Sequence, residues 1–102
     1  PTRELALQVA GELEWVSPHL EVVTIYGGTG YGLQAGVLKR GCDVVVATPG
    51  RALDYLEKRI LSLHDVEIAV LDEADEMLSM GFEEDVETLL GATAKERQTL
   101  LF

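Results

Sequence analysis

The sequence predicts an α/β fold: a parallel β-sheet with helices on both faces. Short β-branched or continuously apolar segments alternate along the chain with segments whose apolar residues recur at helical spacing. Strands separated by helical crossovers run parallel, because each crossover returns the chain to the edge of the sheet where it started. The 102 residues are enough for one small domain with a single core.

Each element is delimited by residues that start or stop regular structure. Thr2 is a candidate N-cap for the first helix, and Pro18 stops that helix. Gly41 and Gly81 end two later helices. Pro49 suits the first turn of a helix capped by Thr48. We expect strands over 21–26, 43–48, 66–72 and 98–102, and helices over 3–17 and 33–40. Three more helices are expected: one that starts at Pro49, a short one through Met77 and Leu78, and one through Val86, Leu89 and Leu90.

The inward-facing residues can be assigned in part. The strand over 66–72 is apolar and is expected to be buried, and Leu53, Leu56 and Ile60 should face the core. Trp15, Tyr31 and Tyr55 are interpreted as packing residues. Cys42 has no second cysteine to pair with and is interpreted as a small buried hydrophobe, which is typical of a reducing, cytoplasmic setting. No apolar run approaches the roughly 18 residues that span a bilayer, and no leader is apparent, so we expect no membrane association.

Acidic residues are concentrated in one part of the chain. The net charge is −10, and between Ile60 and Ala94 there are ten acidic residues and no Lys or Arg. The remainder carries eight acids against eight bases and is neutral. A generic nucleic-acid binder would show a basic surface, so the composition argues against that class without excluding local phosphate contacts.

The unusual residue clusters all follow predicted strands. They are Tyr26 to Gly28, Thr48 to Arg51, and Asp72 to Asp75. In open parallel sheets, ligands bind at the carboxyl ends of the strands, so these clusters indicate a site at one edge. Asp72 could hold Mg²⁺ together with phosphate oxygens, and Glu73 could orient or deprotonate a water molecule. An Asp in this place can equally cap the following helix.

Other clusters also have two interpretations. Gly27 and Gly28 would let backbone N–H groups approach a phosphate, or they form an ordinary turn. Thr48, Pro49 and Gly50 begin a helix, whose N-terminus can bind an anion or can be structural only. Arg3 and Arg51 can each contact phosphates through a bidentate fork, although Arg51 could instead pair with Asp54.

Four motifs in order, "PTRELA" (1–6), "YGG" (26–28), "ATPGR" (47–51) and "VLDEAD" (70–75), resemble those of the DEAD-box ATP-dependent RNA helicases over essentially the whole chain. The resemblance implies a partial RecA-like domain of the P-loop NTPase, Rossmann-like class, with residues 1–102 as part of the first helicase core domain. It implies that Asp72 holds Mg²⁺ on ATP through water, that Glu73 acts on the hydrolytic water, and that Asp75 couples the nucleotide site to a following motif. The implied RNA-backbone residues are Pro1, Thr2, Arg3, Gly27, Gly28, Thr48, Pro49, Gly50 and Arg51.

The chain departs from the family pattern in ways that limit autonomous activity. It contains no GK[ST] phosphate loop, no adenine-reading glutamine motif, no Ser-Ala-Thr motif and no second core domain with arginine fingers. ATP and Mg²⁺ are the implied cofactors of the parent enzyme, and we expect neither to bind tightly to this chain alone. The partner implied is RNA, bound through its phosphates without sequence preference. The alternative is a non-catalytic folding or interaction module.

The absence of the phosphate-loop strand has a structural consequence. "QTLLF" would be left as an apolar strand with unpaired backbone groups, which is a template for pairing with another chain. We therefore expect a homodimer or a segment-exchanged oligomer that forms through this exposed sheet edge.

Overall fold

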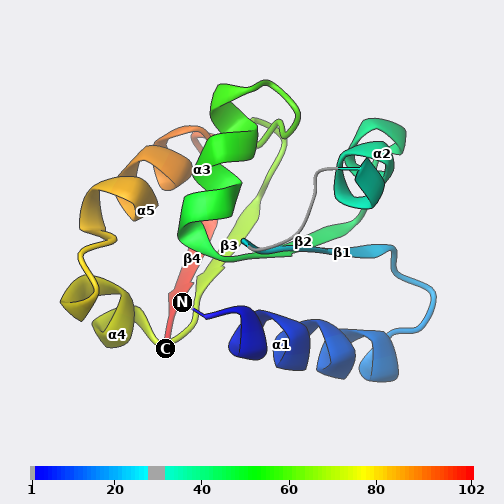
Figure 1. Ribbon diagram of the computed structural model, residues 1–102, viewed down its shortest axis with the longest axis horizontal. Helices are drawn as coiled ribbons and strands as arrows, with labels where there is room; N and C mark the ends of the chain where they lie inside the picture. Colours follow the sequence, from blue (N-terminus) through cyan, green and yellow to red (C-terminus); the bar gives the residue numbers. More distant parts are fainter. Residues whose placement is uncertain (1, 28–31) are drawn as a thin grey trace.

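A computed structural model describes residues 2–27 and 32–102, and Figure 1 shows its arrangement of helices around short strands. Pro1 and Gly28 therefore lie outside the described residues, as does Tyr31. The order of elements alternates helix and strand as predicted. The helices are α1 (Arg3–Val16), α2 (Gly32–Arg40), α3 (Pro49–Glu57), α4 (Ala74–Ser79) and α5 (Glu83–Gly91), and the strands are β1 (Val22–Ile25), β2 (Val44–Ala47), β3 (Ile68–Leu71) and β4 (Gln98–Leu101).

The strands form two parallel pairs. β1 pairs with β2, with Val23 opposite Val45, and β3 pairs with β4, with Val70 opposite Leu100. Within the described residues β2 is not hydrogen-bonded to β3, so the single sheet that we expected is divided into two halves.

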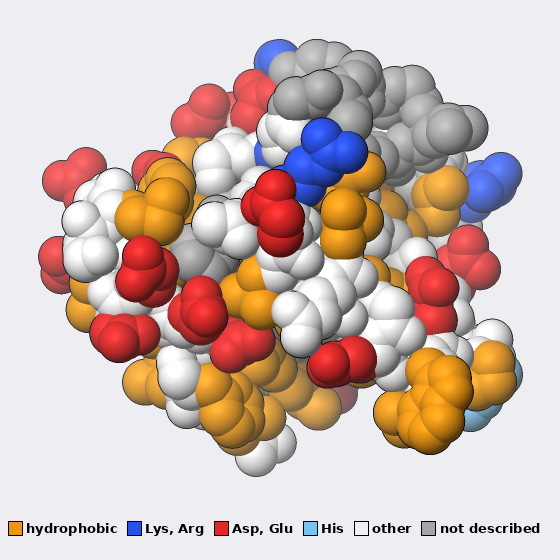
Figure 2. All heavy atoms as spheres, turned by 60° about the horizontal axis from the view of Figure 1, so that its bottom comes forward, with side chains coloured by type: hydrophobic (Ala, Val, Ile, Leu, Met, Phe, Trp, Pro, Cys, Tyr) orange, Lys and Arg blue, Asp and Glu red, His pale blue; other side chains and the backbone are white. Residues whose placement is uncertain are grey.

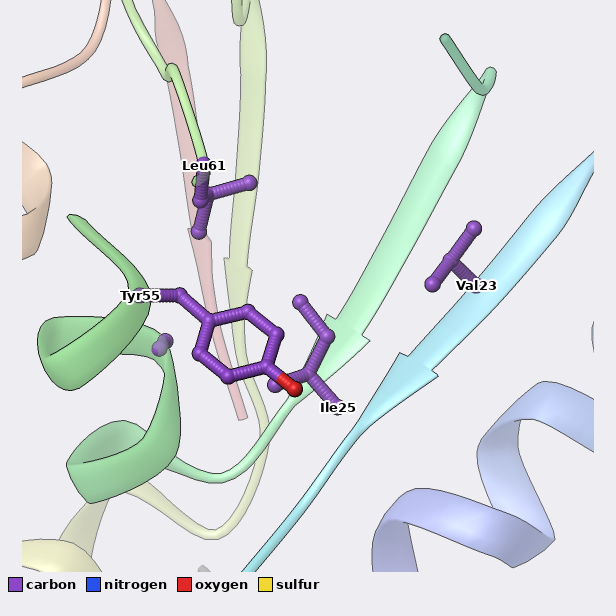
Figure 3. Close-up of a cluster of buried hydrophobic side chains, with 5 residues drawn as sticks. Val23, Ile25, Tyr55 and Leu61 are labelled. Carbon is purple, nitrogen blue, oxygen red and sulfur yellow. The ribbon is translucent and has the colours of Figure 1, made fainter. Parts of the chain in front are cut away.

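The core lies between α3 and the β1–β2 pair. Tyr55 and Ile25 are fully buried, and Val23, Ala52 and Leu61 complete the buried cluster. Figure 3 shows the Tyr55 ring pointing from α3 toward Ile25 on β1, with Leu61 close by. Leu89 of α5 packs against this cluster, whereas no residue of β3 or β4 belongs to it.

α1 covers the opposite face of the β1–β2 pair, which places helices on both faces as predicted (Figure 1). Its buried residues are Ala6 and Ala10. Thr2 caps α1 as expected, because its side-chain oxygen accepts a hydrogen bond from the Leu5 N–H at 3.3 Å. Gly41 and Gly81 follow the ends of α2 and α4 with φ of +94° and +83°, which explains why glycine stands there.

Some predicted core positions were wrong. Ile68 and Val70 are 60% and 53% exposed, because no helix of the described chain covers their face of the β3–β4 pair. The core residues of α3 are Ala52 and Tyr55, while Leu53 and Leu56 are only partly buried. Trp15 is 85% exposed, so its interpretation as a packing residue does not hold in this structure.

Cys42 behaves as the sequence indicated. It is partly buried and packs against the core cluster. Burial raises the pKa of its thiol, and the nearby carboxylates of Asp43 and Glu21 raise it further. A raised pKa lowers the thiolate fraction near neutral pH, which disfavours a role as a reactive nucleophile.

The buried Tyr55 and the exposed Trp15 provide a matched test of the core. Tyr55→Ala is expected to lower the free energy of unfolding by about 3–5 kcal/mol, because it leaves a cavity in the only buried aromatic position described here. Trp15→Ala should change it by less than about 0.5 kcal/mol, because the ring is exposed. Urea denaturation followed by circular dichroism measures both values. Equal losses for the two variants would show that the core is elsewhere.

Candidate functional site

The residues singled out by sequence fall into two groups. The N-terminal group comprises Thr2, Arg3, Gly27 and Thr48–Arg51, all placed by the β1–β2 pair and the helices next to it. The acidic group comprises Asp72, Glu73 and Asp75, which follow β3. Figure 1 shows both strand pairs ending on the side of the molecule where α1 begins and where the chain ends.

A backbone hydrogen bond fixes the strand ends that carry the N-terminal group. The Thr48 N–H donates to the Ile25 carbonyl at 2.9 Å and so ties the end of β2 to the end of β1. α3 begins directly afterwards at Pro49, which is buried. The Thr48 side chain makes no capping hydrogen bond to α3, although Thr48 occupies the N-cap position. The start of α3 therefore presents backbone donors that its own cap residue does not satisfy.

The two arginines of this group each stack over a tyrosine. The guanidinium carbon of Arg3 lies 4.8 Å from the centre of the Tyr26 ring. That of Arg51 lies 5.7 Å from the centre of the Tyr55 ring. Asp54, the partner considered for Arg51, forms an ion pair with Lys58 at 3.2 Å. The sequence placed Tyr26 in a strand-end cluster but gave it no role of its own, and the contact with Arg3 was not predicted.

Two glycines of this group have no steric reason to be glycine. A Cβ atom added at Gly27 or at Gly50 would meet no atom of the described residues within 4 Å. Neither residue has the positive φ found at Gly41 and Gly81. Packing and backbone geometry would therefore accept alanine at both positions.

The acidic group lies at the turn that joins β3 to α4. The β3–β4 hydrogen bonding continues into this turn, since the Phe102 N–H donates to the Leu71 carbonyl at 2.9 Å and the Ala74 N–H donates to the Phe102 carbonyl at 3.0 Å. Asp72, Glu73 and Asp75 are all exposed. Glu73 has φ of +53° and ψ of +51°, a left-handed conformation that costs a non-glycine residue of the order of 1 kcal/mol. α4 starts from that strained residue.

The carboxylates differ in what they contact. Asp75 accepts a hydrogen bond from the Glu76 N–H at 3.0 Å, as a residue in a helix's first turn often does. Neither Asp72 nor Glu73 caps α4 with its side chain, so the capping interpretation of Asp72 finds no support in the described residues. Both side chains are directed to solvent at the end of the strand.

The donor set permits Mg²⁺ only in a limited way. In the described part of the chain, no cluster of three or more His, Cys, Asp or Glu side chains could hold a metal ion. Mg²⁺ keeps several water molecules and commonly takes one or two carboxylates plus substrate phosphates. Asp72 fits as one such ligand through water, and the phosphates would need further binding groups.

A second polar constellation lies away from both groups. Ser62 Oγ is 2.7 Å from His64 Nδ1, and His64 Nε2 is 3.8 Å from Asp65 Oδ2, beside a hollow of about 360 Å³. The His64 and Asp65 side chains are 76% and 97% exposed. A nucleophilic triad needs a buried carboxylate that orients its histidine, so this arrangement is not a hydrolase site.

The similarity to known proteins decides the family. The model of the DEAD/DEAH box helicase family matches residues 1–102. The chain belongs to the DEAD/DEAH box helicase family. Its α/β structure is correspondingly that of a DEAD-box RecA-like domain, as expected from the sequence.

Individual DEAD-box proteins match throughout this chain. The chloroplastic DEAD-box ATP-dependent RNA helicase 3A of Zea mays is 52% identical over 102 residues, which are all of this chain and 14% of that protein. The ATP-dependent RNA helicase CshA of Listeria monocytogenes is 53% identical over 104 aligned residues, covering all of this chain and 20% of that protein. A crystal structure of a DEAD box protein from Methanococcus jannaschii aligns over all of this chain and 28% of its own, with a TM-score of 0.90 and 46% identity. The chain thus spans about a fifth or less of these two curated relatives.

Proposed function

We propose that residues 1–102 are the part of the first core domain of an ATP-dependent DEAD-box RNA helicase that carries the hydrolytic carboxylates and the RNA-backbone contacts. The observation that carries this proposal is the placement of the two groups at the ends of the strands on the same side of the molecule (Figure 1). DEAD-box helicases use ATP and Mg²⁺ and bind RNA, and the roles of individual residues below are extensions of that family property to this chain.

Asp72 and Glu73 have distinct proposed roles. Mg²⁺, when bound with ATP, supplies charge neutralisation at the phosphates, and Asp72 holds it through water. Glu73 orients the attacking water and accepts its proton, a role for which an exposed carboxylate without a capping partner is suited. For Asp75 the proposed role, by analogy with the family, is to couple the nucleotide site to a following motif; the neighbouring Ala74 N–H, which donates to the Phe102 carbonyl, connects this turn to the end of β4.

The N-terminal group is proposed to hold the RNA backbone. The open space at Gly27 and Gly50 is compatible with this role, because the described residues give no steric reason for glycine at either position. A phosphate can approach the backbone N–H groups at the start of α3 more closely where the residue there is glycine, because glycine has no side chain in the way. Thr2, Arg3, Thr48, Pro49 and Arg51 surround this approach, with Pro1 and Gly28 as proposed members outside the described residues. Binding should be independent of sequence and sensitive to salt, because no group here is placed to identify a base.

We expect no measurable ATPase activity from the 102 residues alone. Arginine fingers contribute on the order of 10³–10⁵ in rate, and the phosphate loop contributes most of the nucleotide affinity. The chain has neither motif.

Within the described residues no helix is long and apolar enough to cross a membrane. A cytoplasmic setting is part of the proposal.

Gly50 and Gly11 test the proposed phosphate approach. Gly50→Ala should raise the free energy of unfolding by roughly 0.5–1 kcal/mol and weaken the binding of a fluorescent oligouridine. Gly11→Ala, in the middle of α1 and equally open, should stabilise the chain to a similar extent and leave RNA affinity unchanged. Urea denaturation and fluorescence anisotropy provide the two measurements. If Gly50→Ala binds RNA as well as the parent chain does, the approach of a phosphate does not explain the presence of glycine at position 50.

The proposed hydrolytic role requires the missing parts of the enzyme. Residues 1–102 would replace the matching segment of a complete DEAD-box helicase, with a Glu73→Gln version as the matched control. We expect RNA-stimulated ATP hydrolysis by the chimera and its loss, by about two orders of magnitude or more, in Glu73→Gln. A chimera that folds and stays inactive would favour the alternative of a non-catalytic folding or interaction module.

A homodimer or segment-exchanged oligomer is a further part of the proposal. All four residues of β4 are exposed, and Leu101 and Phe102 are 65% and 71% exposed. On one face of the β3–β4 pair, Ile68, Val70 and the Leu100 opposite Val70 form an uncovered apolar surface, which favours association with another chain. Figure 2 shows hydrophobic side chains reaching the surface beside the acidic residues on the side of α4 and α5.

The oligomer can be tested with two exposed hydrophobic residues, Leu101 and Trp15. Light scattering after size exclusion should give a dimer mass that Leu101→Lys shifts to the monomer, because a charge on the strand disfavours edge pairing. Trp15→Lys, on α1, should leave the mass unchanged. A monomer at every concentration would refute the proposed oligomer.

A further inference from the structure

The Arg3 side chain is held by an aromatic ring and not by a carboxylate. Its guanidinium carbon lies 4.8 Å from the centre of the Tyr26 ring. Among the described residues no Asp or Glu forms an ion pair with Arg3 and no acceptor is hydrogen-bonded to it. The side chain is otherwise exposed.

Stacking and ion pairing leave an arginine in different states. A carboxylate partner occupies the N–H donors at the edge of the guanidinium, whereas an aromatic ring covers only its face. Arg3 over Tyr26 is therefore restricted in orientation while its N–H donors remain directed outward. An arginine in that state loses less conformational freedom when it binds a phosphate.

Tyr26 and the start of α3 both follow strands whose ends are hydrogen-bonded to each other. It directly follows β1, and the Thr48 N–H donates to the carbonyl of the preceding residue, Ile25, at 2.9 Å. Ile25 is fully buried, so this point of the backbone is firmly placed. Arg3 belongs to a different element, the first turn of α1. The contact with the Tyr26 ring therefore places the Arg3 guanidinium relative to the ends of β1 and β2, and so relative to Thr48–Arg51.

We propose that Tyr26 is a positioning residue. Its ring orients the Arg3 guanidinium for a nucleic-acid phosphate, so that Arg3 acts together with the backbone N–H groups at the start of α3. The inference rests on the proposed RNA-binding function and adds to it a residue that contributes through Arg3. Tyr26 itself need not touch the RNA, because the ring face toward Arg3 is already covered.

The test is a double-mutant cycle on the 102-residue chain, with a short fluorescein-labelled oligouridine as probe and a series of KCl concentrations. Tyr26→Leu should weaken binding about 2- to 5-fold, the range expected for an exposed cation–π contact. Tyr26→Phe should retain the parental affinity, because it keeps the ring. In the Arg3→Gln background, Tyr26→Leu should have no further effect.

The salt dependence separates positioning from charge. Arg3→Gln should reduce the slope of log K against log salt by about 0.7, since one phosphate contact to a single strand is lost. Tyr26→Leu should weaken binding without changing that slope. Circular dichroism establishes that each variant is folded. In the absence of RNA, ring-current shifts of the Arg3 Nε–H resonance should disappear in Tyr26→Leu and persist in Tyr26→Phe.

The outcomes that overturn the inference are distinct from failure of the proposed function. Equal weakening by Tyr26→Leu in both backgrounds would mean that the ring contacts RNA by itself. Weakening by Arg3→Gln with no effect of Tyr26→Leu would remove the positioning role and leave the RNA site intact. If the parent chain does not bind the probe, or if Arg3→Gln binds it equally well, the RNA-contact proposal fails and the inference fails with it.

Discussion

The packing of Tyr55 against Ile25 is the contact on which the arrangement depends. Both side chains are fully buried, one on α3 and one on β1 (Figure 3). An aromatic ring of this size buries roughly 150–250 Å², so this contact supplies a large share of a small core. It also sets where α3 begins, because Thr48 is hydrogen-bonded to Ile25 and Pro49 is buried beside it. The position of the proposed phosphate contacts therefore follows from the position of one tyrosine.

The division of the sheet constrains how the two groups can communicate. The N-terminal group is built on the β1–β2 pair and the acidic group on the β3–β4 pair, and no strand hydrogen bonds join the pairs in the described residues. What connects them is side-chain packing, with α3 against α5 and Leu89 against the Tyr55 cluster. Side-chain packing offers discrete alternative arrangements more readily than a continuous hydrogen-bonded sheet does. The packing of α3 against α5 is therefore one contact through which the proposed RNA contacts could be linked to the second half of the segment.

The sequence predicted the order of elements, because caps and breakers act locally. Thr2, Gly41 and Gly81 each delimit a helix as expected, and the "DEAD" turn follows its strand. Exposure was predicted less well. An apolar segment such as "IAVL" shows that a strand can be buried, but burial depends on which other elements cover it, and here nothing described covers Ile68 and Val70. The Arg3 contact with Tyr26 was equally inaccessible to pattern analysis, because it joins residues from separate elements.

Backbone strain at Glu73 supports its proposed role only in combination with other observations. Among the described residues, glycine stands at two positive-φ positions, Gly41 and Gly81, where a side chain would add strain. Glutamate stands at a third, and the conformation alone does not indicate function, since Arg59 also has a φ of +60° without any assigned role. Glu73 differs from Arg59 in its surroundings, because it stands next to Asp72 at the end of a strand, in a turn that is hydrogen-bonded to Phe102. Glu73 thus combines a strained backbone with a side chain that makes no capping hydrogen bond. These features together are what we expect of a carboxylate whose role is to contact a water molecule or a nucleotide.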